Sequence, residues 1–254
     1  MLQERRARIM DILDNTGVVH VSDLTATFGV SAETIRRDLE ALEEKGHLCR
    51  IHGGAVPMYN RGVEPAYNKR IVAHFTEKQA IAREALKLVS DGDVIQIDIG
   101  TTTLEFAKML VGNYRITVLT NSLLIAGTLA ADERITVIVT GGIVRMGDLS
   151  LSGSLSNENM RNFNTDKLFL GAGGIDPKKG VTDYHLGETD FRKIAMGNTQ
   201  RVIVLADNSK FGVIAMNRVC EVKKIDTLIA DSGTDPAVLD EFSALGCHVI
   251  CAAV

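Results

Sequence analysis

Cysteine is scarce in this chain of 254 residues, and its few cysteines do not form a recognisable pattern. A disulfide framework or a structural zinc site needs cysteines at defined spacings, usually with Cys-x-x-Cys pairs or nearby histidines. No such pair or ligand set surrounds the four that are present, which are Cys49, Cys220, Cys247 and Cys251. We therefore expect a protein of a reducing compartment that holds no metal ion and no cofactor.

Long apolar runs are also missing. No segment approaches the roughly 18 consecutive apolar residues of a membrane-spanning helix, and the N-terminal stretch lacks the apolar core of a signal peptide. Hydrophobic residues still make up 45% of the chain, which is enough for an ordinary globular core. These features predict a cytoplasmic protein with no membrane partner, built from two domains or from one large domain.

An excess of positive charge is absent as well, since the chain has a formal net charge of −4. Within residues 1–57 nine acidic residues outnumber seven basic ones, which are Arg5, Arg6, Arg8, Arg36, Arg37, Lys45 and Arg50. Because nucleic-acid-binding domains are usually basic, DNA binding by this region would depend on where its few arginines lie. Few phosphate contacts per copy would favour several copies acting together on one DNA.

The stretch from residue 28 to residue 55 nevertheless has the pattern of a DNA-reading helix. Ser31 is suited to cap its N-terminus, and Ile35, Leu39 and Leu42 fall at i, i+4 and i+7 on one apolar side. Two shorter helices are expected before it, one over residues 2–14 and one that Ser22 begins. A short turn at Gly29 would join the second and third helices into a helix-turn-helix.

Residues 47–51 and 54–56 are β-prone and are expected to pair as a small wing. A pair of arginines on a helix is usually just a solvated charged face, so the prediction of DNA contact depends on this surrounding pattern. The third helix and the wing together offer hydroxyl, carboxylate and basic side chains for base edges and phosphates. The predicted DNA contacts are Ser31, Glu33, Thr34, Arg36, Arg37, Arg50 and His52.

Periodicity is lost after residue 57 and returns near residue 76. We therefore assign residues 1–57 to a DNA-binding domain, 58–75 to a linker, and 76–254 to an effector-binding and oligomerisation domain. In the last domain apolar β-prone runs alternate with helical segments, which predicts a mainly parallel sheet covered by helices on both faces. The expected strands are 94–99, 116–120, 135–140, 167–172, 201–207, 225–231 and 248–252, and the expected helices are 76–90, 102–111, 122–131, about 154–162, 187–198 and 235–244.

Glycine and hydroxyl residues follow five of these strands, at the end where parallel sheets bind ligands. Glycine lets a backbone approach a ligand closely, hydroxyls donate to anionic oxygens, and helix N-termini attract phosphate. A single such cluster is usually a plain turn, but five at one edge indicate an anion-binding site. The clusters lie at residues 98–103, 120–122, 140–142 with 152–154, 171–174, and 207–210.

The run VSAETIRRDLEALEEKGHLCRIHGGA, from residue 30 to residue 55, resembles the signature of the DeoR family of bacterial transcriptional regulators. The C-terminal part resembles the sensor domain of that family in its DIGTT, TNS, GG and DNSKFG elements. The resemblance implies a winged helix-turn-helix domain followed by an α/β domain related to ribose-5-phosphate isomerase and glucosamine-6-phosphate deaminase. It also implies a phosphorylated sugar or polyol as the effector.

The matching positions also imply which residues would bind that effector. The resemblance assigns contacts to Asp98, Gly100, Thr101, Thr102, Thr103, Asn121, Ser122 and Lys210. The strand-end clusters add Gly141, Gly142, Ser152, Gly153, Gly173, Asp207 and Ser209. Glu188 is either an acid that binds an effector hydroxyl or an ordinary carboxylate at a helix N-terminus.

We predict a homo-dimeric or homo-tetrameric repressor of a sugar or polyol catabolic operon, released from its double-stranded DNA operator by the effector. The alternative is a sugar-phosphate isomerase or deaminase with an accessory N-terminal module, in which Asp98, Glu188 and Lys210 would transfer protons. The alternative lacks a paired-carboxylate cluster, because the related place reads GAGGIDPKKG and has Asp176 as its one acid. An extended apolar surface pattern that would indicate a scaffold is also missing.

Overall fold

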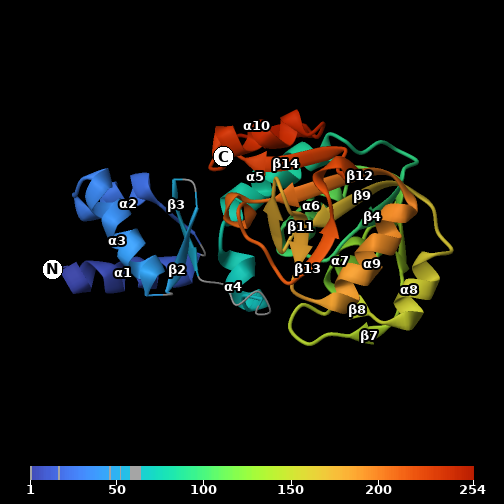
Figure 1. Ribbon diagram of the computed structural model, residues 1–254. Coiled ribbons are helices and arrows are strands. Elements are labelled where there is room, and N and C mark those ends of the chain that lie inside the picture. The colour runs from blue at the N-terminus through green and yellow to red at the C-terminus, as the bar shows by residue number, and fades with distance from the viewer. Residues whose placement is uncertain (1, 17, 46, 52, 58–63) are drawn as a thin grey trace.

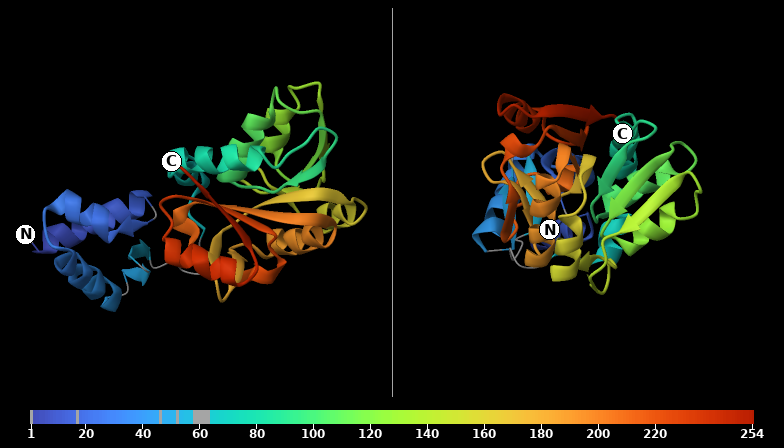
Figure 2. Two further views of the ribbon diagram at one scale, coloured as in Figure 1. Left: turned by 90° about the horizontal axis from the view of Figure 1, so that it is seen from above. Right: turned by 90° about the vertical axis from the view of Figure 1, so that its right-hand side faces the viewer.

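The computed structural model describes residues 2–16, 18–45, 47–51, 53–57 and 64–254. These residues form a smaller N-terminal domain and a larger α/β domain, which lie end to end in an elongated molecule (Figures 1 and 2). Strand β3 of the smaller domain lies between its helices and the larger domain (Figure 1). Among the described residues, no helix has both the length and the apolar character that crossing a bilayer requires.

The N-terminal domain combines a helical bundle with a small antiparallel sheet. Its sheet has the order β1-β3-β2, so β2 and β3 form the predicted wing. Buried apolar side chains from all its helices form its core, including Ile9, Leu13 and Ile35, which have no exposed surface. Its elements are α1 (Leu2–Thr16), β1 (Val19–His20), α2 (Val21–Phe28), α3 (Ala32–Glu44), β2 (Leu48–Ile51) and β3 (Gly54–Pro57). The predicted winged helix-turn-helix is thus confirmed.

Local signals set most helix ends in this domain, with one exception. Gly29 has φ +63°, the left-handed conformation that glycine adopts freely, and it closes α2 before the turn into α3. Ser31 accepts a hydrogen bond from the Thr34 N–H, as an N-cap should. The predicted cap at Ser22 is wrong: the N-cap is His20, two residues earlier, and the Val21 N–H at the start of α2 donates to the Gly53 carbonyl.

The α/β domain is built on a seven-stranded sheet within the described residues, and every pairing in that sheet is parallel. Each strand falls within or next to a predicted apolar run. In spatial order the strands are β15 (His248–Ala252), β14 (Thr227–Asp231), β12 (Thr199–Ala206), β9 (Thr165–Gly171), β4 (Val94–Ile97), β5 (Ile116–Thr120) and β6 (Ile135–Val139). The predicted parallel sheet is confirmed.

Helices cover both faces of this sheet, as the continuous apolar character of its strands predicts. One core lies under α5, α6 and α7, where Phe106 stacks on Phe169 with ring centroids 4.2 Å apart. The other lies under α8, α9 and α10, where Phe191 and Phe242 are fully buried. These helices are α5 (Phe75–Leu86), α6 (Thr101–Leu110), α7 (Leu123–Leu129), α8 (Ser154–Met160), α9 (Leu186–Gly197) and α10 (Pro236–Ala244).

Several short elements were not predicted. Gly180 is one reason: a Cβ there would come within 2.0 Å of the Cys220 carbonyl oxygen, so glycine allows a close strand pairing that local sequence does not announce. Two antiparallel sheets, β10-β11-β13 and β7-β8, stand beside the main sheet, and a short helix, α4, forms in the linker. The unpredicted elements are α4 (Tyr67–Val72), β7 (Ile143–Val144), β8 (Leu151–Ser152), β10 (Gly174–Asp176), β11 (Gly180–Asp183), η1 (Asn208–Lys210), β13 (Asn217–Cys220) and η2 (Val222–Lys224).

The strand order places a ligand crevice. From β4 the chain proceeds outward through β5 to β6, then returns to β9 on the other side of β4 and proceeds outward to β15. The order therefore reverses between β4 and β9. Ligands of open parallel sheets bind where the loops after two such strands separate, at their carboxyl ends.

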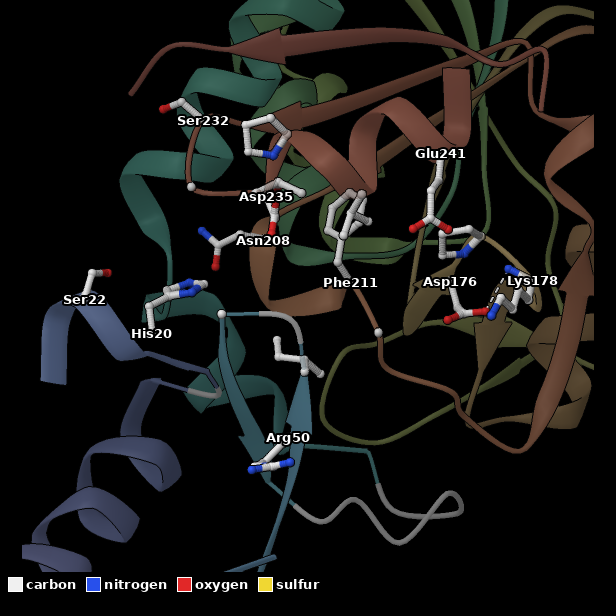
Figure 3. A pocket seen from close by; sticks show the side chains of 18 residues that line it. His20, Ser22, Arg50, Asp176, Lys178, Asn208, Phe211, Ser232, Asp235 and Glu241 are labelled. Carbon is white, nitrogen blue, oxygen red and sulfur yellow. Dashed lines mark hydrogen bonds between the residues drawn. The ribbon is translucent and has the colours of Figure 1, made fainter. Parts of the chain in front are cut away.

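The two domains touch over a small apolar contact beside an open cleft. Val18 and Val56 pack against Val213 of the α/β domain, and Ile51 of the wing joins them. Next to this contact lies a cleft of about 590 Å³. Figure 3 shows Arg50 on the wing side of the cleft and Lys178 on the opposite side. Because the apolar contact is small, the domains have room to change their relative position.

Candidate functional site

The crevice between β4 and β9 brings several predicted effector residues together. Gly100, Thr101 and Thr102 follow β4, Gly173 follows β9, and Lys210 comes from the loop after β12. All five line one cavity of about 30 Å³. The threonines open α6, so its N-terminal N–H groups face the same region, and the site combines hydroxyl, amide and ammonium donors suited to an anion.

Asp98 lies beneath this cavity, and its side chain is fully enclosed. It is 1% exposed, its Oδ2 accepts a hydrogen bond from the Gly171 N–H at 3.1 Å, and the Nε of Arg192 donates to the same oxygen at 2.8 Å. Arg192 also pairs with Asp183. Burial raises the pKa of Asp98, and Arg192 opposes that shift. Asp98 therefore joins the loops after β4 and β9 to α9 from below.

Other predicted residues lie near the crevice but serve local structure. Thr103 donates to the Gly100 carbonyl, Ser122 caps α7 by accepting from the Ile125 N–H, and Asn121 donates to the Leu151 carbonyl. Asp207 accepts from the backbone and hydroxyl of Ser209 at the start of η1. None of these side chains lines the cavity.

The remaining glycine and serine positions lie around the hairpin β7-β8 and do not line the cavity. A Cβ at Gly142 would come within 2.5 Å of the Ser152 carbonyl oxygen, so the close packing of this hairpin requires glycine there. Gly141 and Gly153, both with positive φ, lie in the same region. The hairpin is tied to the sheet because Leu151 donates its N–H to the Asn121 carbonyl.

Glu188 belongs to an ion-pair cluster beside the crevice. It lies in the first turn of α9 and is 3% exposed. Its Oε1 accepts from the Ser150 hydroxyl at 3.0 Å and lies 3.0 Å from the Nε of Arg145. Burial raises its pKa to about 7, although Arg192 and Arg145 lower it. Burial thus favours the protonated carboxyl, which can donate as well as accept hydrogen bonds.

Replacing Glu188 with glutamine is expected to stabilise the fold more at pH 8 than at pH 5. The pKa is raised from 4.5 to about 7, so the folded state holds the proton more tightly and the wild type loses stability as pH rises from 4.5 to 7. Glutamine cannot ionise, so the variant avoids this loss of about 3 kcal/mol in the free energy of unfolding. Urea unfolding of both proteins at the two pH values measures the difference.

The matched control for this prediction is Glu158→Gln, on the exposed surface of α8. It is expected to change stability equally at both pH values. A Glu188→Gln protein whose stability relative to wild type is the same at pH 5 and pH 8 would show that Glu188 ionises normally in the fold.

The linker contributes residues to the crevice that were not predicted. Glu64, Pro65 and Arg70 line the cavity together with the threonine loop. Glu64 is held by Arg145 on one side and Arg70 on the other, at 2.9 Å each. The linker was assigned from its lack of periodicity, and no periodic pattern was available to indicate where its charged residues would lie.

The exposed side of α3 presents most of the predicted DNA contacts. Ser31, Arg36 and Arg37 are exposed and Thr34 is partly so, and the side chain of Arg37 is 75% exposed. Arg37 forms an exposed ion pair with Glu33 at 3.3 Å, which DNA phosphates would readily replace. The N-terminal half of α3 is thus free of tertiary contacts on one side.

Arg50 is placed differently from the α3 residues. Its Nε lies 3.0 Å from Glu43, its Nη1 lies 3.7 Å from Glu40, and the residue also lines the interdomain cleft. Its charge is therefore largely balanced by α3. His52 lies outside the described residues. An unpredicted anchor is Asp38, which is 1% exposed and accepts from Arg5 and Arg6, so these arginines fix α1 on α3.

The cysteines and other metal-binding residues form no centre in the part of the chain that the structure describes. Its cysteines are free, with Cys49 and Cys251 exposed and Cys220 and Cys247 buried. The same described residues contain no group of three or more histidine, cysteine, aspartate or glutamate side chains positioned to hold a metal ion.

Two family models match the chain. A DeoR-like helix-turn-helix domain matches residues 5–59, and the DeoR C-terminal sensor domain matches residues 73–232. The chain belongs to the DeoR family of transcriptional regulators. The first match contains the exposed α3 surface, and the second contains β4, β9 and the loops that follow them, while Glu64, Pro65 and Arg70 lie between the two matches. The predicted family is therefore confirmed for both domains.

Curated members of the DeoR family match along nearly the whole chain. The transcriptional regulator GolR of Listeria innocua is 36% identical, over 97% of this chain and 97% of its own length. The transcriptional repressor AccR of Agrobacterium fabrum is 34% identical, over 91% and 90%. The glycerol-3-phosphate regulon repressor of Escherichia coli is 30% identical, over 93% of each chain. This DeoR-family chain is accordingly a DNA-binding transcriptional regulator and not an isomerase or deaminase.

Solved structures resemble this DeoR-family chain less closely. Ribose 5-phosphate isomerase A of Methanocaldococcus jannaschii aligns with 55% of each chain, at 24% identity and a TM-score of 0.40. A translation initiation factor of Pyrococcus horikoshii aligns with 78% of this chain and 68% of its own, at 17% identity and a TM-score of 0.42.

Proposed function

We propose that this protein is a repressor of a sugar or polyol catabolic operon, and that a phosphorylated sugar or polyol releases it from its operator. The observation that carries the proposal is that linker residues Glu64 and Arg70 line the same cavity as Thr101, Thr102 and Lys210. A ligand in this crevice therefore meets the segment that leads to the DNA-binding domain. The repressor names of AccR and the Escherichia coli relative support the sign of regulation.

The phosphate of the effector would bind at the N-terminus of α6. Thr101 and Thr102 offer hydroxyls and lie where the free N–H groups of the helix begin, and Lys210 adds a positive charge from the opposite loop. Gly100 has φ +154°, a conformation that favours glycine. Because glycine has no side chain, the approach to that end of the helix stays open. Asp98, Thr103, Asn121, Ser122, Asp207 and Ser209 would hold these loops in place from below.

Effector binding must favour one arrangement of the two domains, since a ligand with equal affinity for both arrangements would switch nothing. The small apolar contact among Val18, Val56 and Val213 and the open cleft beside it allow a second arrangement at modest cost. A change in linker position would then alter the distance between DNA-binding domains in an oligomer and remove their simultaneous fit to two half-sites.

Oligomer formation would use exposed apolar side chains of the α/β domain. The hairpin β7-β8 exposes Ile143 by 75% and Met146 by 94%, and Leu186 at the start of α9 is 60% exposed. Figure 1 shows β7 and β8 on the side of the α/β domain away from α3, whereas Met146 lies in a loop that borders the linker. An apolar surface of this kind usually marks an interface. Sedimentation as a dimer or tetramer, reduced to monomer by Met146→Lys, would support the assignment, and a monomeric wild type would refute it.

Replacing Arg37 with alanine is expected to weaken specific operator binding by roughly 1–3 kcal/mol, the usual value of an arginine that contacts a guanine edge. The side chain of Arg37 is 75% exposed, so its loss leaves the core unchanged and the melting temperature nearly the same. Gel-shift titration on operator DNA measures the affinity.

The control for this prediction is Arg83→Ala, because Arg83 is exposed on α5 in the other domain. Unchanged affinity in both Arg36→Ala and Arg37→Ala would remove α3 from DNA reading.

The effector half of the proposal is tested by thermal denaturation of the wild-type protein with a panel of sugar and polyol monophosphates. A ligand that binds only the folded state stabilises it by RT ln(1 + L/Kd), where L is the concentration of free ligand, and so raises the melting temperature. At least one member of the panel is expected to raise it, and the same compound is expected to release operator DNA in a gel shift. A panel with no stabilising compound would refute a phosphorylated effector.

A further inference from the structure

The linker divides what would otherwise be one larger cavity. On its inner side lies the cavity of about 30 Å³ next to Thr101 and Thr102, which holds about one water molecule. On its outer side lies an open groove of about 540 Å³, which Arg145 and His185 line. Glu64, Pro65, Arg70 and Asp148 line both. Ligand sites typically measure about 300–1,000 Å³, so the inner cavity alone is too small for a sugar phosphate.

The carboxylate of Glu64 is the main contact between this partition and the α/β domain. Its Oε2 accepts a hydrogen bond from Arg145 Nη1 at 2.9 Å, and His185 Nε2 lies 2.9 Å from the same oxygen. Its Oε1 lies 2.9 Å from Arg70 Nη2, within the linker itself. The side chain is only 14% exposed. An anionic group of the protein thus lies against Arg145, Arg70 and His185 at the edge of the candidate effector site, and Arg145 keeps contacts with Asp148 and Glu188 as well.

We propose that Glu64 is a built-in anion that must leave Arg145 and His185 before the phosphorylated effector can bind. This inference rests on the proposed function and adds how the crevice is regulated. When Glu64 leaves, the inner cavity and the outer groove become one site that reaches from the α6 N-terminus to Arg145. Polar and anionic groups of the effector then take the place of the Glu64 carboxylate.

The far end of the linker is anchored, which confines the movement. Lys78 of α5 is 2% exposed, and its ammonium group donates to the carbonyls of Arg70 and Ala73 at the C-terminal end of α4. Burial lowers the pKa of Lys78 to about 8. Because this end of α4 is held, displacement begins at Glu64, on the side of the linker that leads to the DNA-binding domain. The contact that the effector breaks therefore lies at the end of the described linker that is nearer in sequence to the DNA-binding domain.

In a protein without the Glu64 carboxylate, effector binding no longer has to break the contact with Arg145 and His185. Glu64→Ala is therefore expected to bind the effector more tightly, by a factor within the roughly 5- to 150-fold range of allosteric coupling. By the same linkage, operator affinity without ligand is expected to fall. Backbone amides of residues 64–73 are expected to exchange hydrogen faster, because the linker loses its anchor.

The experiment compares wild type, Glu64→Ala and the control Glu84→Gln, which removes a partly buried carboxylate of α5 that pairs with the exposed Lys87 at 2.7 Å. Hydrogen exchange of residues 64–73 is measured without ligand. Binding of inorganic phosphate and of glycerol 3-phosphate is measured by calorimetry. Faster exchange and tighter binding in Glu64→Ala alone are the expected results.

Each other outcome has a defined meaning. If the wild type binds a phosphate probe and Glu64→Ala binds it no more tightly, the proposed function stands and the role of Glu64 is refuted. If residues 64–73 exchange equally in both proteins, the contact does not hold the linker, and the inference is refuted without reference to any ligand. If neither protein binds either probe, the proposed phosphate site is refuted, and the proposed displacement of Glu64 is refuted with it.

Discussion

Replacing Arg192 with methionine is expected to lower the free energy of unfolding of the α/β domain by about 3–5 kcal/mol, the usual cost of breaking a buried ion pair from one side. Arg192 is 3% exposed and neutralises Asp98 and Asp183, which are 1% and 3% exposed. Methionine fills similar volume but leaves two buried carboxylates without a cation. Urea unfolding followed by circular dichroism measures the loss.

Two further variants make this prediction specific. Lys193→Met changes the exposed neighbour of Arg192 on the same helix and is expected to leave stability nearly unchanged. Adding Asp98→Asn to Arg192→Met removes one of the orphaned charges and is expected to recover part of the loss. A loss below about 1 kcal/mol for Arg192→Met alone would mean that the carboxylates find other partners or bind protons at little cost.

Replacing Lys210 with alanine is expected to raise the effector concentration needed to release operator DNA by roughly 10- to 100-fold. A hydrogen bond to a charged group contributes about 1.5–3 kcal/mol, and each 1.4 kcal/mol changes affinity tenfold. Lys210 lines the cavity beside Thr101 and Thr102 and belongs to a different domain from α3, so operator affinity without ligand is expected to stay the same. For a repressor, the cell would remain uninduced.

Thr102→Val tests the same site from the opposite loop, because it removes one hydroxyl and keeps the shape of the side chain. Lys179→Ala, an exposed lysine of the turn between β10 and β11, is the control and is expected to respond like wild type. Effector titrations of a preformed DNA complex measure the shift. If Lys210→Ala and Thr102→Val stayed folded but lost DNA binding outright, these loops would be structural and the effector would bind elsewhere.

The elements of both domains could be predicted from the sequence wherever one local pattern determines structure. Strands such as β5 and β14 are short apolar runs because they are buried on both faces, and the helices between them are long enough to show periodicity. Helix α3 has its own cap at Ser31 and its own apolar side. Its exposed residues therefore follow from the spacing of its apolar ones.

The candidate site was only partly predictable. The sequence indicates the residues of each loop, but it does not indicate which other loops lie beside them in the fold. Thr101 and Thr102 follow a strand and open a helix, which the sequence shows directly. Which other loop faces them depends on the order of the strands in the sheet. That β9, and not β5, lies across the crevice is seen only in the tertiary structure. Asn121 and Ser122 therefore appeared equivalent to Gly173 in the sequence, although only Gly173 lines the cavity.

By itself the sequence determined the family, the two folds, the exposed side of α3 and the loop that begins α6. Each of these depends on residues close together in the chain. The tertiary structure alone decided that Arg192 lies between two buried carboxylates, that Asp98 lies beneath the cavity, and that Glu64 lies against Arg145. The contacts of Arg192 with Asp98 and of Glu64 with Arg145 join residues tens of positions apart, and their charges resemble ordinary surface charges until the fold removes water from around them.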